Sequence, residues 1–256
     1  MRTFRNLTLI LLTIIMIGGL MSLMSCTDNS THWQLEPPAS GEEYVLLETS
    51  MGEIKIRLFP EETPLAYENF ITHVRNGFYD GIIFHRIVEN FMLQTGDPEG
   101  TGIGGESIWG DGFATESDHN LKHFRGALSM ANRGAFDLES NTSQFFIVQN
   151  RSLSSSDNEL LDAARNRGLI SRRDANVYRE HGGTPMLDPS ISTHLGELFP
   201  GAQPFPGHPV FGQVFYGMDV VDAIAAVEVE MQPGGTERSR PVEEVYIVRA
   251  VVQTMD

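Results

Sequence analysis

The chain contains one cysteine, Cys26, among its 256 residues. A single cysteine has no partner in the same chain, so the fold cannot depend on an intramolecular disulfide. Basic residues are also scarce, with 18 lysines and arginines against 34 aspartates and glutamates. A surface with that excess of negative charge repels phosphate backbones, which argues against nucleic acid as a partner.

Long hydrophobic runs are absent except at the N-terminus. Arg2 and Arg5 precede an almost wholly apolar run over residues 7–20, and small polar residues follow it. This order is typical of a secretory signal peptide, which we place at residues 1–25. An uncleaved membrane anchor is the alternative, because the run is just long enough to serve as one.

The end of this run favours cleavage. Leu23-Met24-Ser25-Cys26 resembles the lipobox of bacterial lipoproteins, in which cleavage precedes a cysteine that becomes lipidated. Residues 26–41 are polar and contain Pro37-Pro38, so we interpret them as a lipidated N-terminus and a flexible tether. We expect lipidation at Cys26 and a location in the cell envelope, extracytoplasmic, facing the periplasm or in the outer membrane.

The remaining residues, 42–256, suit a single domain with a large core. Without Arg2 and Arg5 the chain keeps 16 basic residues against 34 acidic ones, a formal charge of −18, which we attribute to solubility. Apolar residues occupy every second position on both sides of Met51-Gly52, which predicts a β-hairpin. Thr63-Pro64 begins a predicted helix that stops at Asn76-Gly77.

The same kinds of pattern predict further short strands and a second long helix. We expect strands at 82–88, 91–96, 126–132, 143–149, 209–215 and 243–253, and a helix at 218–227. The pattern predicts a mostly β fold: a closed antiparallel barrel of about eight strands capped by two helices. A partly helical insertion at about 151–207 interrupts it, in which Ser156 and Glu159 fit a capping box.

Arg86 stands among the apolar residues of the predicted strand at 82–88. A permanently charged guanidinium in such a place needs a compensating partner. Alternation puts Phe84, Arg86 and Val88 on one side of the strand, and His85 on the other, where it would be a structural histidine. Taken alone, Arg86 would more often form a surface ion pair than act in catalysis.

Four blocks set Arg86 in a wider context, in the order "FHRIVENFMLQTGD", "GALSMAN", "SQFFI" and "HPVFGQV". They resemble the signature blocks of the cyclophilin family, the cyclophilin-type peptidyl-prolyl cis/trans isomerases. The resemblance covers about residues 43–253, apart from the segment between Asn150 and His208. It implies an eight-stranded antiparallel barrel with a helix over each end, a substrate groove on the outer face, and neither a cofactor nor a metal.

The resemblance also implies the site residues. It places the catalytic arginine at Arg86. The positions it assigns to substrate binding are Phe91, Met92, Gln94, Ala131, Asn132, Gln144, Phe146, Leu187 and His208. Among them, Phe91, Met92 and Phe146 correspond to the hydrophobic pocket, and Ala131-Asn132 to the stretch whose backbone holds the peptide.

One part of the family pattern is displaced. In the family an aromatic-leucine-aspartate-glycine run closely precedes the pocket histidine, whereas "FPG" precedes His208 here. The fragment "TPMLDPS" suggests that Leu187-Asp188 is the equivalent, separated from His208 by an insertion at 189–206. Met186 then stands where compact members often have tryptophan, which leaves sensitivity to cyclosporin-class inhibitors open.

Prolyl isomerisation needs few chemical groups. Its barrier of about 20 kcal/mol comes from amide resonance, and no bond to another atom breaks. An apolar slot can grip the proline ring while a guanidinium donates to the amide nitrogen as it regains its lone pair. We expect the side-chain carbonyl of Gln94 to fix the guanidinium plane.

Several of these residues have ordinary alternatives. Phe91, Met92 and Phe146 would usually be plain core residues. His208 could be a base or a metal ligand, but it lacks cysteine or histidine at ligand spacing, which favours a wall of the pocket. "GTGIGG" matches a dinucleotide-binding pattern without the helix that should follow, so we expect a flexible loop beside the groove instead.

We therefore expect a monomeric, lipid-tethered isomerase that acts on X-Pro bonds of exported proteins while they fold. The alternative is a non-catalytic cyclophilin-like module or chaperone of the cell envelope that binds proline segments. The presence of both Arg86 and Gln94 favours the enzyme, and the long 151–207 segment favours some partner-specific role.

Overall fold

The computed structural model describes residues 31–256 except 119 and 133–138. The predicted signal peptide and Cys26 lie outside the described residues. The first described element is the short 3-10 helix η1 (Trp33–Leu35). No helix in the described part of the chain is long and apolar enough to cross a membrane.

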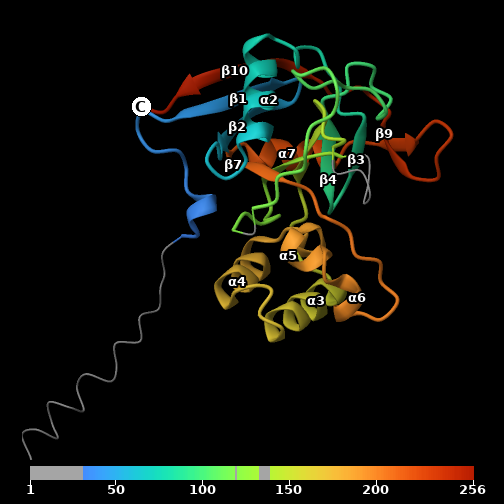
Figure 1. Cartoon of the computed structure of the whole chain (residues 1–256). Helices are drawn as coiled ribbons and strands as arrows, with labels where there is room; N and C mark the ends of the chain where they lie inside the picture. Colours follow the sequence, from blue (N-terminus) through green and yellow to red (C-terminus); the bar gives the residue numbers. More distant parts are fainter. Residues whose placement is uncertain (1–30, 119, 133–138) are drawn as a thin grey trace, which may run out of the picture. The chain divides into compact units, whose positions relative to one another are not determined.

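Eight strands form one antiparallel sheet (Figure 1). They are β1 (Glu43–Thr49), β2 (Gly52–Leu58), β3 (Arg86–Val88), β4 (Met92–Thr95), β5 (Ala127–Met130), β6 (Phe145–Val148), β7 (Val210–Tyr216) and β10 (Ile247–Thr254). Their order in the sheet is β10-β1-β2-β7-β5-β6-β4-β3. Two further strands, β8 (Val229–Met231) and β9 (Arg238–Pro241), pair only with each other.

The predicted closure of the barrel is not confirmed, and the sheet is a half-barrel whose edges are β10 and β3. The segment before β3 makes only an isolated bridge, Ile83 to Tyr246, together with hydrogen bonds such as Phe84 N–H to Val245 O at 2.8 Å. β3 itself has three residues, so it is too short to carry a continuous ladder across to β10.

The core lies where the sequence alternation predicts it. In the β1–β2 hairpin Val45 pairs with Ile56 and Leu47 pairs with Ile54, and all four side chains are fully buried. Side chains directly opposite in antiparallel strands share a face, so the pairs form one continuous apolar layer.

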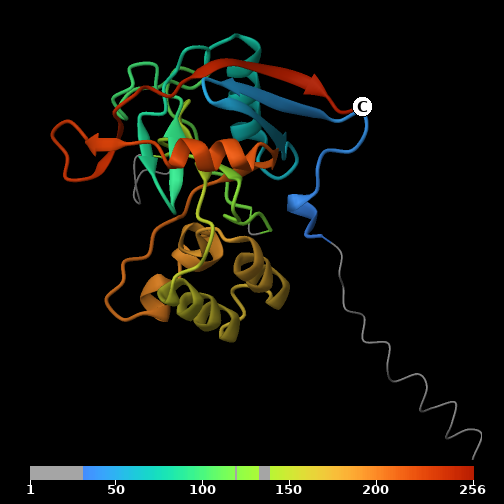
Figure 2. The same cartoon turned by 180° about the vertical axis from the view of Figure 1, so that it is seen from behind.

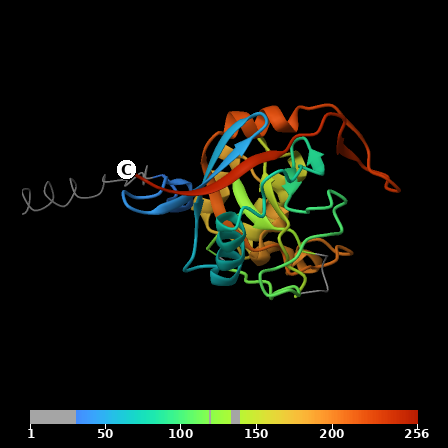
Figure 3. The ribbon, with the colours of Figure 1, turned by 90° about the horizontal axis from the view of Figure 1, so that it is seen from above.

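Two helices cover this sheet on opposite sides (Figure 3): α2 (Pro64–Arg75) and α7 (Met218–Ala225). α2 begins with Pro64 at its first position and ends at the Asn76-Gly77 stop that the sequence predicts. Figure 2 shows α7 running across the other side of the strands.

The segment 151–207 folds into a group of helices beside the sheet (Figures 1 and 2). The elements are α3 (Ser155–Asn166), α4 (Arg172–His181), η2 (Pro185–Leu187), α5 (Pro189–Ser192) and α6 (Leu195–Leu198). Leu161, Tyr178 and Ile191 anchor a hydrophobic cluster of its own, which Phe124 joins from the loop before β5. The insertion is therefore packed onto the sheet domain through apolar contacts.

The predicted capping box of the first insertion helix is wrong by two residues. Ser154, not Ser156, is the N-cap, and its hydroxyl accepts from Asp157 N–H at 3.1 Å while Asp157 accepts from the backbone of Ser154. Asp serves here as the reciprocal partner, a role that the sequence pattern reserves for Glu or Gln.

Candidate active site

Three neighbouring strands supply the near wall of the candidate site. Arg86 on β3 lies opposite Gln94 on β4, and Gln94 lies opposite Phe146 on β6. Opposite residues in an antiparallel sheet share a face. The ladder therefore places a guanidinium, an amide and a phenyl ring in one row.

That row lines a pocket of about 140 Å³. Its lining residues are Arg86, Phe91, Met92, Gln94, Ala131, Asn132, Phe146, Leu187 and His208. Every residue that the sequence proposes for substrate contact is in this set except Gln144. The structure thus brings together residues that span more than a hundred positions of the chain.

Gln144 lies in an adjoining pocket of about 280 Å³, which shares Gln94, Ala131 and Asn132 with the first. Its amide accepts from Gln94 Nε2 at 2.9 Å and donates to Gly104 O at 2.8 Å. Gln144 therefore links the site to the glycine-rich loop. The shared residues make the two pockets parts of one groove.

The glycine-rich loop lies beside the groove, as the sequence predicts, but its backbone is tied down. The buried carboxylate of Asp97 accepts from the backbone N–H groups of Glu99, Thr101 and Gly102 at 2.7–2.9 Å. Backbone donors held by a carboxylate fix the loop conformation. The expectation of a flexible loop therefore has no support in these contacts.

Arg86 makes the contact with Gln94 that the sequence suggests. Its Nη1 donates to Gln94 Oε1 across 3.4 Å, a long and therefore weak hydrogen bond. The guanidinium carbon also lies 5.8 Å from the centre of the Phe91 ring. Both contacts leave the charge partly exposed at the mouth of the pocket.

A stronger partner of Arg86 is absent from the sequence-based set. Glu237 accepts from Arg86 Nε at 2.6 Å and from Nη2 at 2.9 Å, a bidentate ion pair. The hydrogen bond from Arg86 lowers the pKa of Glu237 from its ordinary value. Glu237 lies 151 residues further along the chain, in the turn before β9, and no local pattern marks it.

The far wall of the pocket comes from Leu187 at the end of η2 and from His208. His208 Nδ1 donates to Met130 O at 3.1 Å, and its ring meets Phe146 edge-to-face with centroids 5.4 Å apart. Burial lowers the pKa of His208 to about 4. The ring is neutral at neutral pH, which suits a wall of the pocket better than a base.

Gly207 explains how Leu187 and His208 meet although an insertion separates them. A side chain at residue 207 would come within 2.9 Å of Leu187 O and 3.0 Å of Pro189, and the residue has φ of 79°. Only glycine fits such a close approach in the left-handed region. The two ends of the insertion at 189–206 therefore lie next to each other, at the wall of the pocket.

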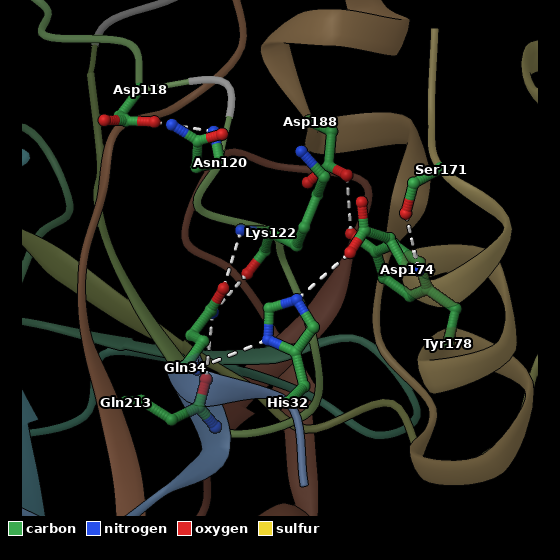
Figure 4. A network of polar contacts seen from close by, with 10 residues as sticks. All are labelled: His32, Gln34, Asp118, Asn120, Lys122, Ser171, Asp174, Tyr178, Asp188 and Gln213. Atoms are coloured by element: carbon green, nitrogen blue, oxygen red, sulfur yellow. Dashed lines mark hydrogen bonds and ion pairs between the residues drawn. The ribbon is translucent and has the colours of Figure 1, made fainter. Parts of the chain in front are cut away.

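Asp188, next to Leu187, attaches the insertion to the sheet domain. It is fully buried and accepts from His123 N–H at 2.8 Å, and it is bonded to His123 Nδ1 at 2.9 Å. Its other oxygen accepts from the Tyr178 hydroxyl of α4 at 2.8 Å (Figure 4). The residue beside the pocket is thus held by both the insertion and the loop before β5.

The N-terminal residues of the described chain strengthen this junction (Figure 4). His32 is bonded to Asp174 of α4 at 3.0 Å. Gln34 donates to Lys122 O at 2.7 Å and to Gln213 of β7 at 3.1 Å. His32 and Gln34 lie within residues 26–41, which the sequence pattern assigns to a flexible tether. The expectation of a tether that reaches residue 41 is therefore wrong, because these buried side chains belong to the folded unit.

His85 has the structural character that the sequence predicts for it. Its side chain is buried, and burial lowers its pKa to about 4. Neither ring nitrogen has a hydrogen-bond partner in the structure. Within the described residues no group of three or more histidine, cysteine, aspartate or glutamate side chains could hold a metal ion.

Comparison with known proteins now defines the class. The family model described as "Cyclophilin type peptidyl-prolyl cis-trans isomerase/CLD" matches residues 44–252. This chain belongs to that family. It is an enzyme of the peptidyl-prolyl cis/trans isomerase class, which acts on proline-containing polypeptides.

Individual relatives agree with this assignment. A Staphylococcus aureus protein named "Putative peptidyl-prolyl cis-trans isomerase" is 38% identical over 208 residues, 81% of this chain and 90% of that protein. A Staphylococcus haemolyticus protein of the same name is 38% identical over 204 residues, 79% of this chain and 87% of that protein.

Solved structures support the fold. A Cryptosporidium parvum cyclophilin-type isomerase superposes with a TM-score of 0.60 at 26% identity, covering 84% of this chain and 99% of that one. The same protein crystallised in the presence of the dipeptide Ala-Pro gives a TM-score of 0.59 at 25% identity, covering 82% and 99%.

Proposed function

We propose that Arg86 and the pocket beside it accelerate X-Pro isomerisation in exported proteins. The observation that carries the proposal is the row of Arg86, Gln94 and Phe146 on three paired strands, facing one small pocket. It combines a permanent hydrogen-bond donor with an apolar slot, the two things that the reaction needs.

In this mechanism the proline ring enters the slot between Met92, Phe146 and Leu187. The preceding amide then twists out of resonance, and its nitrogen regains a lone pair. Arg86 Nη1, which faces Gln94 and Met92, donates to that nitrogen. Stabilisation of the twisted state by about 5–7 kcal/mol would accelerate the reaction roughly 10⁴- to 10⁵-fold.

The test replaces the guanidinium of Arg86. In a protease-free assay with a proline-containing peptide, we expect the full chain in mild detergent to be active and Arg86→Ala to lose at least about 100-fold in kcat/KM. Arg86→Lys keeps the charge but loses the planar fork, so we expect an intermediate rate. An Arg86→Ala rate equal to that of the wild type would overturn the mechanism.

We also propose that the enzyme is a monomer tethered to the cell envelope by a lipid on Cys26. The basic residues, the apolar run and the lipobox-like segment before Cys26 support this location. In cells fed a labelled fatty acid, we expect the wild-type chain to take up label and fractionate with membranes. Cys26→Ser should take up no label, and a labelled Cys26→Ser protein would contradict the proposal.

A further inference from the structure

The ion pair between Arg86 and Glu237 has a geometry that a chance surface contact rarely has. Two parallel hydrogen bonds, 2.6 and 2.9 Å long, join the Nε and Nη2 edge of the guanidinium to both carboxylate oxygens. This fork-to-fork arrangement fixes the plane of the guanidinium as well as its position. The pair joins the β8–β9 hairpin to β3.

Glu237 is itself held in place. Ser239, which is fully buried, donates to Glu237 Oε2 at 2.8 Å. Gln232 donates to Ser239 Oγ at 3.1 Å and to His85 O at 2.8 Å, and its backbone N–H donates to Glu237 O at 2.9 Å. A continuous chain of hydrogen bonds therefore runs from the backbone next to Arg86, through the hairpin, to the carboxylate.

The fork decides which nitrogen of Arg86 faces the pocket. Nε and Nη2 are engaged by Glu237, whereas Nη1 lies 3.4 Å from Gln94 Oε1 and 3.9 Å from Met92 Sδ, both of which line the pocket. Glu237 does not line the pocket. It can therefore act on a bound peptide only through Arg86, whose orientation it fixes.

Stability gives little reason for this arrangement. The side chains of Arg86 and Glu237 are 32% and 44% exposed, and exposed ion pairs usually contribute little to folding, although bidentate geometry puts this pair at the favourable end of the range. Arginine has many rotamers in solution, and a fixed fork removes that freedom before substrate arrives. A donor fixed in advance does not have to reorganise during the reaction.

We propose that Glu237 is a positioning residue of the isomerase, which holds Arg86 so that Nη1 points at the isomerising amide. This proposal rests on the proposed function of Arg86. Because Glu237 does not touch the pocket, its loss should lower kcat and leave KM nearly unchanged. Loose placement of a group at the reaction centre can lower the rate by as much as about 100-fold, and we expect about 10-fold or more for Glu237→Ala.

The test compares variants on one hairpin in the full chain in mild detergent. Glu237→Gln keeps one carbonyl oxygen for the fork, so we expect a kcat between those of the wild type and Glu237→Ala. Glu230→Ala is the matched control, because Glu230 is an exposed residue of β8 and its loss removes the same charge from the same hairpin. We expect Glu230→Ala to keep the wild-type kcat.

A double variant separates positioning from a general structural role. In an Arg86→Lys background the fork is already lost, so Glu237→Ala should cause no further loss of kcat. Losses that multiply, a change confined to KM, or a rise in kcat with Glu237→Ala would each overturn the inference. Melting temperatures of all variants identify any that fail to fold, and Glu237→Gln then gives the answer in place of Glu237→Ala.

The two proposals can fail separately. If Arg86→Ala is inactive while Glu237→Ala and Glu237→Gln match the wild type, the positioning role is wrong and the function of Arg86 stands. If Arg86→Ala is as active as the wild type, the function proposed for Arg86 fails, and the role of Glu237 fails with it.

Discussion

The two walls of the pocket are built in different ways. The near wall is a row of side chains on β3, β4 and β6, whose spacing is set by backbone pairing between strands only a few residues long. The far wall consists of Leu187 and His208, which an insertion separates in the sequence. Only tertiary contacts hold these two residues together. The comparison shows that a helical insertion can lengthen a loop at the active site without displacing the residues at its two ends.

The far wall should therefore be the more sensitive to loss of a single polar group. Asp188→Ala removes the acceptor of His123 and Tyr178, and leaves their donors buried without partners. We expect the free energy of unfolding to fall by about 3–5 kcal/mol. Urea denaturation followed by circular dichroism measures it.

Asp162→Ala is the matched control, because Asp162 is an exposed aspartate of the same insertion that pairs with Arg179. Its loss should change the free energy of unfolding by about 0–1 kcal/mol. Equal unfolding midpoints for the Asp188 and Asp162 variants would show that Asp188 does not attach the insertion to the sheet domain.

A second prediction addresses the point where the insertion closes on itself. Gly207→Ala puts a Cβ within 2.9 Å of Leu187 O at a φ of 79°. We expect a loss of stability of about 1–3 kcal/mol and a higher KM for a proline peptide, because Leu187 must move. Thermal unfolding and steady-state kinetics measure the two effects.

Gly201→Ala provides the comparison for that strain. Gly201 has a similar φ of 94°, but a Cβ there would meet nothing within 4 Å. It should lose stability through backbone strain alone and keep the wild-type KM. If both variants raise KM alike, the close approach of Gly207 to Leu187 is irrelevant to the pocket.

The smallest expected effect concerns pH. Burial lowers the pKa of His208 to about 4, below the ordinary histidine value of 6.5. The unfolded chain therefore binds a proton first, and this residue's contribution to stability is lost as pH falls from about 6.5 to about 4. Above pH 7 it contributes no pH dependence.

Unfolding free energies measured between pH 7.5 and 4.5 check that stability falls as the pH falls. His85 has its pKa lowered to about 4 in the same way, so some pH dependence must remain in any His208 variant. We expect His208→Asn to flatten the slope without abolishing it. A slope that is unchanged in His208→Asn would mean that the ring is not kept neutral by burial.

Much of the fold and of the site follows from local sequence pattern. Alternation around Met51-Gly52 predicts the β1–β2 hairpin, and the Thr63-Pro64 start and Asn76-Gly77 stop predict α2. The signature blocks place Arg86, Gln94 and Phe146 in strands. These features depend on residues close together in the chain, whose periodicity is fixed by backbone geometry.

Tertiary structure alone decided the rest. The sheet stays open between β3 and β10. The insertion closes where Gly207 meets Leu187, and Arg86 pairs with Glu237; both contacts join residues far apart in the sequence. No period or spacing encodes such contacts, because they form only when long loops close and their surfaces pack. The sequence by itself determined that Arg86 would stand beside an apolar slot, and the folded chain decided what holds it there.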